Sequence, residues 1–175
     1  MMKECKDEVF GIWANPERAA LADTNIPYHL TIELTGRCLG SCIYCYSSSE
    51  GATGHLFPTE RVYSLIDEAL RIGSKGIVWH GGDPILHPNW YDFAGYTRDK
   101  GLKNICIMPN PMSITPKAAK MLADAEMDSV LIHIDTINQE VYNQLHTNPK
   151  TLELKIRGYR NLLEAGYPPR QVIGV

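Results

Sequence analysis

The feature that most constrains the fold is a regular alternation of short apolar runs with longer helical patterns. We expect five strands, covering Tyr28–Leu34, Lys75–His80, Lys103–Met108, Ser129–Ile134 and Gln171–Val175. Segments with apolar residues at helical spacing separate the later runs, as between Glu60 and Ile72. Strands that alternate with helices form right-handed βαβ units, so the sequence predicts an α/β fold with about five βα units on a parallel sheet.

The first expected strand has one apolar and one polar side. Its apolar positions, Leu30, Ile32 and Leu34, alternate with His29, Thr31 and Glu33. In a β/α barrel the apolar side packs on the helices and the polar side lines the interior. A sheet with one face in water would show the same alternation, but the helical pattern that follows favours the barrel. We therefore predict a partial (β/α) barrel over residues 28–175, preceded by an N-terminal extension over residues 1–27.

Three of the five cysteines, Cys38, Cys42 and Cys45, lie within eight residues of one another. A structural zinc site uses four protein ligands, and an ordinary four-iron cluster uses four thiolates. Three thiolates on one loop can instead hold three irons of a cubane and leave the fourth iron open for chemistry. The alternatives are a zinc site in which His55 or His80 supplies the fourth ligand, or simply a set of reactive thiols.

The cysteines belong to a long connection, Thr35–Phe57. Connections of this length without regular structure are usually functional or disordered, so we expect a cluster loop in its front half and a mobile tail in its back half. The remaining cysteines lie far away in sequence. Cys5 is expected to be an incidental exposed thiol, and Cys106, between two isoleucines, is expected in the core.

Composition and charge exclude several classes of function. Hydrophobic residues make up 44% and charged residues 21%, which is ordinary globular usage. The net charge of −3, with lysine and arginine spread along the chain, argues against nucleic acid or an anionic membrane as the main partner. No apolar run approaches the roughly 20 residues that span a bilayer, and the charged start lacks the apolar region of a signal peptide. An odd number of cysteines with three clustered favours a metal site in a reducing cytoplasm.

Two further motifs follow the cysteines in the chain. Gly81-Gly82-Asp83-Pro84 comes directly after the second expected strand, and Leu131-Ile132-His133-Ile134-Asp135 forms the fourth. Together with the CxxxCxxC spacing and an aromatic residue before the last cysteine, this order resembles the radical S-adenosylmethionine (radical SAM) superfamily. The resemblance covers roughly residues 28–150.

The resemblance implies a [4Fe–4S] cluster on Cys38, Cys42 and Cys45, with S-adenosylmethionine chelating the open iron through its amine and carboxylate. In the family, one electron then splits the sulfonium into methionine and a 5′-deoxyadenosyl radical, which takes a hydrogen atom from the substrate. The resemblance further implies a one-electron donor such as a flavodoxin or ferredoxin. It also implies a substrate that is a peptide, a protein or a small cofactor precursor. The sequence identifies no catalytic base or hydrogen donor.

The same resemblance implies which residues contact S-adenosylmethionine. They are Tyr44, Gly81, Gly82, Asp83, Pro84, Asn110, His133 and Asp135. By carry-over from the family, Asp83 faces the ammonium group and Tyr44 lies near the adenine. Glycines allow backbone to approach a ligand closely and to adopt positive φ. A tight turn with a capping acid would also explain the glycine pair and Asp83, and a structural role would explain His133.

Family cores resemble six-stranded partial barrels, so the five strands expected here are one strand and one helix short. We therefore expect a truncated core. Two alternatives to the enzyme stay open at this point. One is a non-catalytic module that binds zinc or an iron–sulfur cluster, and the other is a catalytically incomplete fragment that folds without turning over.

Overall fold

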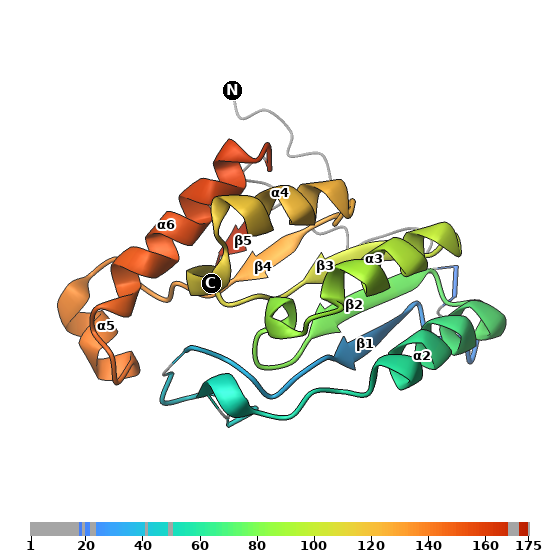
Figure 1. Ribbon diagram of the computed structural model, residues 1–175, viewed down its shortest axis with the longest axis horizontal. Helices are drawn as coiled ribbons and strands as arrows, with labels where there is room; N and C mark the ends of the chain where they lie inside the picture. Colours follow the sequence, from blue (N-terminus) through green and yellow to red (C-terminus); the bar gives the residue numbers. More distant parts are fainter. Residues whose placement is uncertain are drawn as a thin grey trace.

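The structure is a computed structural model that describes Arg18 and residues 20–21, 24–40, 42–48, 51–167 and 172–174. The N-terminal extension predicted for residues 1–27 therefore falls largely outside the described residues. Figure 1 shows a layer of helices lying over a single sheet. No helix among the described residues combines the length and the apolar character needed to cross a membrane.

Within the described residues, the sheet contains five strands in the order β1-β2-β3-β4-β5. These strands are β1 (His29–Glu33), β2 (Gly76–His80), β3 (Lys103–Ile107), β4 (Val130–Ile132) and β5 (Val172–Gly174). Every neighbouring pair is parallel. The predicted α/β fold with parallel strands is therefore confirmed, and the strand order follows the chain.

Helices connect successive strands. They are α2 (Thr59–Ile72), α3 (Trp90–Asp99), α4 (Pro116–Asp124), α5 (Gln139–Leu145) and α6 (Thr151–Glu164), with short 3-10 helices at Gly51–Thr53, Pro84–Leu86 and Pro111–Ser113. Local sequence sets several of the ends. Gly73, at φ +87°, ends α2, and its N–H donates to the carbonyls of Ala69 and Leu70. Thr115 caps α4 by accepting from the Ala118 N–H.

The main core lies between the helices and one face of the sheet. Apolar residues of the strands, such as Ile32, Trp79 and Ile132, pack there against the helices. One buried polar side chain joins the two layers. Asn104 accepts from the Trp79 indole at 3.0 Å and donates to the Ala94 and Ala125 carbonyls, each at 2.9 Å. Because all its polar atoms are satisfied, this amide ties β2 and β3 to α3 and α4 without an unpaired group.

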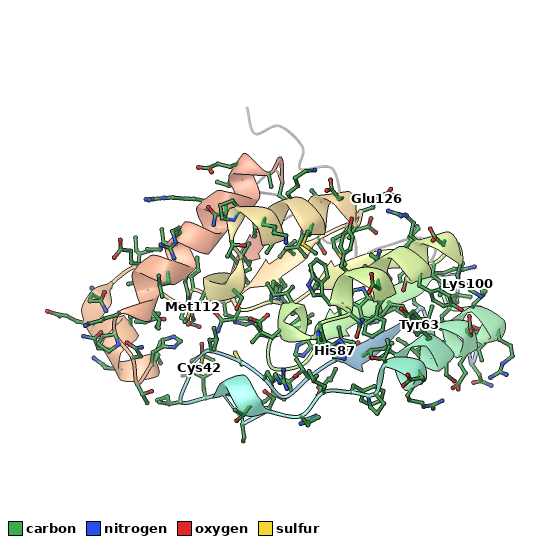
Figure 2. All side chains as sticks on the ribbon, in the orientation of Figure 1. Cys42, Tyr63, His87, Lys100, Met112 and Glu126 are labelled. Carbon is green, nitrogen blue, oxygen red and sulfur yellow. The ribbon has the colours of Figure 1, made fainter. Side chains whose placement is uncertain are left out.

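The opposite face of the sheet carries a smaller apolar cluster. It contains Tyr28, Val78, Ile105 and Cys106, which confirms the core position predicted for Cys106. Because the strands are parallel, their carboxyl ends meet at one edge, where α/β proteins build their sites. Figure 2 shows Cys42 and Met112 beyond this edge, whereas Lys100 and Glu126 lie at the opposite end.

Candidate cofactor site

A cavity of about 260 Å³ opens at the carboxyl ends of the strands. That volume lies close to the lower end of small-molecule sites. Of the predicted site residues, its lining includes Cys38, Cys42, Cys45, Tyr44, Gly81, Gly82, Asn110 and His133. The loops after β1, β2, β3 and β4 thus bring together residues far apart in sequence. Asp83, Pro84 and Asp135 are not part of the lining.

Backbone pairing between its two halves holds the cluster loop in place. The N–H groups of Phe57, Gly36 and Cys38 donate to the carbonyls of Leu34, His55 and Gly51 at 2.8, 3.1 and 2.9 Å. The Arg37 guanidinium adds a bond to the Gly54 carbonyl at 2.8 Å. The expected mobile tail is therefore wrong for residues 51–57, because this return segment pairs with the start of the loop.

The glycine pair after β2 presses against the same segment. The Gly82 and Asp83 N–H groups donate to the carbonyls of Thr35 and Arg37, each at 2.7 Å. A Cβ on Gly81 would lie 2.6 Å from the Thr35 oxygen, and one on Gly82 would lie 2.5 Å from the Arg37 oxygen. Gly81 also has φ +129°, which L side chains rarely adopt. The motif therefore holds the start of the cluster loop, besides lining the cavity.

The Cys38 sulfur receives two hydrogen bonds, from the Gly40 N–H at 3.2 Å and from Asn110 Nδ2 at 3.3 Å. Burial raises the pKa of the Cys38 thiol, and these two donors oppose that effect. A Cβ on Gly40 would lie 3.2 Å from the Cys38 sulfur and 3.8 Å from the Cys42 sulfur. Two of the three thiols therefore border the same small space. Cys45 Sγ lies 3.3 Å from Ser47 Oγ.

Asp83 lies behind the glycine pair and is fully buried. Its Oδ2 accepts from Ser113 Oγ at 2.5 Å, whereas its buried Oδ1 has no hydrogen-bond partner among the described residues. Burial raises the pKa of Asp83 to about 7. This carboxyl thus joins the turn after β2 to the 3-10 helix Pro111–Ser113. The contact with an ammonium group that the resemblance implies for Asp83 stays a prediction.

Asp83 gives a prediction about pH. Since its folded-state pKa is raised from 3.8 to about 7, its contribution to stability is full below pH 3.8 and is lost as the pH rises through 7. Asp83→Asn keeps the shape and removes the titration. Between pH 5 and 8 the wild-type free energy of unfolding should fall by about 2–3 kcal/mol more than that of the variant. Urea unfolding at both pH values measures this, and equal slopes for the two proteins would contradict it.

Asp135 anchors a second polar cluster beside the cavity. Its Oδ1 accepts from the Tyr44 hydroxyl at 2.5 Å, and its Oδ2 lies 2.8 Å from His146 Nε2 and 3.5 Å from Lys155 Nζ. Asp135 has φ +70°, a conformation that aspartate and asparagine tolerate better than most residues. Next to it, the Ile43 N–H donates to the Leu145 carbonyl at 3.0 Å. The cluster loop is thus fastened to α5 and α6.

The charges in this cluster balance. Burial alone would raise the pKa of Asp135, but bonds from Tyr44 and His146 and the Lys155 ammonium together hold it below its usual value. Burial lowers the pKa of His146 despite its carboxylate partner. The imidazole is therefore neutral near pH 7, and Lys155 supplies the positive charge opposite Asp135.

The sequence analysis missed both His146 and Lys155. Each is only 2% exposed, and Lys155 lines the cavity. A signal for Lys155 was present, because it occupies a buried helical stripe of α6 that includes Leu152, Gly158 and Leu162. A lysine on such a stripe is rarely buried without a partner or a function.

Replacing Asp135 by asparagine should weaken the attachment of the cluster loop to α5 and α6. Asparagine accepts the positive φ but leaves the buried Lys155 ammonium without its countercharge, so we expect a loss of about 3 kcal/mol in unfolding free energy. Hydrogen exchange at the Ile43 amide should become faster. Asp99→Asn is the matched control, because that carboxylate is 74% exposed and its loss should cost less than about 0.5 kcal/mol. Similar losses for both variants would refute the anchoring role.

The fold and the cavity define an α/β partial barrel with a three-cysteine loop at the carboxyl ends of its parallel strands. The family model of the radical SAM superfamily matches residues 32–175. The chain belongs to the radical SAM superfamily. Members of this family use a [4Fe–4S] cluster and S-adenosylmethionine.

Curated relatives support this membership. The chain is 29% identical over 150 residues to the AdoMet-dependent heme synthase of Methanosarcina barkeri, covering 85% of this chain and 42% of that protein. It is 30% identical over 146 residues to a protein of Methanosarcina acetivorans named "Probable GTP 3′,8-cyclase", covering 80% of this chain and 43% of that protein. The chain therefore spans less than half the length of these enzymes.

Solved structures show the same fold. Streptococcus suis SuiB bound to S-adenosylmethionine superposes with a TM-score of 0.65 and 19% identity, over 85% of this chain and 35% of that chain. The protein anSMEcpe with bound AdoMet and Cp18Cys peptide gives a TM-score of 0.61 and 18% identity, over 83% of this chain and 41% of that chain. At these identities the likeness concerns the fold alone.

Proposed function

We propose that this chain is the cofactor-binding part of a radical SAM enzyme, in which Cys38, Cys42 and Cys45 hold a [4Fe–4S] cluster. The observation that carries the proposal is that all three cysteines line one cavity at the carboxyl ends of the strands. No three His, Cys, Asp or Glu side chains in the described part of the chain converge tightly enough for a single metal ion. Thiols spread around a cavity suit a cluster whose corners are separate iron atoms.

The cluster and S-adenosylmethionine together supply a 5′-deoxyadenosyl radical when both are bound. The chain's own residues bind, orient and shield these groups. Gly81 and Gly82 offer backbone at the cavity wall, and Tyr44 offers an aromatic ring. His133 and the buried ammonium of Lys155 belong to the polar part of the lining. Lys155 is suited to an anionic group such as the carboxylate of the methionine moiety.

We also propose a substrate class and a redox partner for this enzyme. The proposed substrate is a peptide, a protein or a cofactor precursor, and the relatives named as an AdoMet-dependent heme synthase and a probable GTP 3′,8-cyclase support a small molecule such as a cofactor precursor. The one-electron donor would be a small redox protein such as a flavodoxin or ferredoxin. The relatives' additional length leaves open the second candidate, a chain that binds the cluster but lacks part of the substrate wall.

Anaerobic reconstitution with iron and sulfide tests the proposal. We expect about four irons per chain, and 5′-deoxyadenosine formation after addition of S-adenosylmethionine and dithionite. A cluster without 5′-deoxyadenosine would favour the incomplete core. One tightly held zinc in place of iron would favour the non-catalytic module instead.

A further inference from the structure

The side chain of Asn110 has one defined orientation at the cluster loop. Asn110 precedes the 3-10 helix Pro111–Ser113 and caps it, since its Oδ1 accepts from the Met112 N–H at 3.1 Å. The amide nitrogen must then point the other way, and it donates to the Cys38 sulfur at 3.3 Å. Both residues are more than nine-tenths buried. Water is therefore a poor substitute for this donor.

Neighbouring groups fix the amide in place. A Cβ on Gly40 would lie 2.7 Å from Asn110 Nδ2, so glycine at position 40 is what lets the amide reach the sulfur. On the other side, the Ser113 N–H donates to the Asn110 carbonyl at 3.0 Å, and Ser113 Oγ bonds to the buried Asp83. The Asn110 amide is therefore held by contacts on two sides, with Gly40 on one and Ser113 on the other.

Hydrogen bonds to cysteine sulfur are one of the ways in which a protein sets the potential of an iron–sulfur cluster. An N–H group aimed at a thiolate stabilises negative charge, so it favours the reduced cluster over the oxidised one. Resting on the cluster function proposed above, we propose that Asn110 is a positioning residue that raises the reduction potential of the cluster through Cys38.

Two substitutions separate this role from the capping role. Asn110→Asp keeps an oxygen for the Met112 N–H, removes the N–H donor and places negative charge beside the sulfur. Asn110→Ala removes both cap and donor. If Asn110 tunes the potential, both variants should be harder to reduce, and Asn110→Asp more so. At a fixed poise, the ratio of oxidised to reduced cluster should rise at least about tenfold, which equals 59 mV for a one-electron couple.

The measurement is a dithionite or mediator titration of the reconstituted chain, followed by electron paramagnetic resonance of the reduced cluster. Circular dichroism confirms that each variant folds, and iron per chain confirms loading. A wild-type potential in Asn110→Asp together with a shifted one in Asn110→Ala would reduce the residue to a cap and overturn the proposal. If Asn110→Asp folds but takes up no iron, Asn110→Ser takes its place, because the serine hydroxyl can still cap the 3-10 helix while the amide donor to Cys38 is lost; a lowered potential in Asn110→Ser supports the proposal, and a wild-type potential overturns it.

The two proposals fail differently. A wild-type chain that binds no iron overturns both of them. A wild-type chain that binds the cluster, with unchanged potentials in both variants, overturns the role of Asn110 and leaves the cluster assignment standing.

Discussion

Cys42→Ala is expected to reduce the iron content of the reconstituted chain from about four per chain to almost none. Two thiolates cannot hold the three protein-bound corners of a cubane, and the Cys42 sulfur borders the same space as Cys38. The change removes one sulfur from a partly exposed loop, so the fold should survive. Visible absorbance and iron and sulfide assays measure the loss.

The chain offers a matched control in Cys106→Ala. Cys106 is fully buried in the small apolar cluster and does not line the cavity. This variant should keep its full iron content and lose only about 1 kcal/mol of stability from the lost packing. Wild-type absorbance in Cys42→Ala, or equal iron loss in both variants, would remove Cys42 from the ligand set.

Local patterns in the sequence account for most of the fold. The two-residue alternation around Ile32 and the apolar run ending at His80 each predicted a strand that the structure contains. The end of α2 at Gly73 is also a local effect, because glycine readily adopts the positive φ that ends the helix. Such features depend on neighbours a few residues away, so they can be read directly from the order of residues.

The parts of the site that escaped prediction depend on contacts distant in sequence. Lys155 and His146 are held at the site by contacts with Asp135, which lies in the loop after β4. The structural link between Asp83 and Ser113 joins residues 30 positions apart. Likewise, the length of the connection predicted a mobile tail that includes residues 51–57, and their pairing with Leu34–Cys38 leaves no periodic signal in the sequence. Tertiary hydrogen bonds between irregular segments follow no short-range rule, and only the structure reveals them.

Helix α6 reaches the cavity because of a single glycine. Gly158 faces the 3-10 helix Pro111–Ser113, and a Cβ on it would lie 1.9 Å from the Pro111 carbonyl oxygen. Close by, Asn161 Nδ2 donates to the Ile114 carbonyl at 2.7 Å. The close packing at Gly158 and the Asn161 hydrogen bond hold α6 near the 3-10 helix Pro111–Ser113. They thereby place Lys155 at the cavity wall and support the backbone that follows Asn110. Packing of α6 and geometry of the site are therefore coupled.

Gly158→Ala should consequently destabilise the protein by about 3 kcal/mol, at the upper end of overpacking effects, because backbone must move to admit the methyl group. The same substitution in α3, Gly95→Ala, meets no atom of the described residues within 4 Å and should instead stabilise by about 0.5–1 kcal/mol through helix propensity. Thermal unfolding would then shift in opposite directions for the two variants, downward for Gly158→Ala and upward by about 1–4 °C for Gly95→Ala. Equal melting temperatures would mean that α6 does not rest on the Pro111 carbonyl, and the position assigned to Lys155 would lose its support.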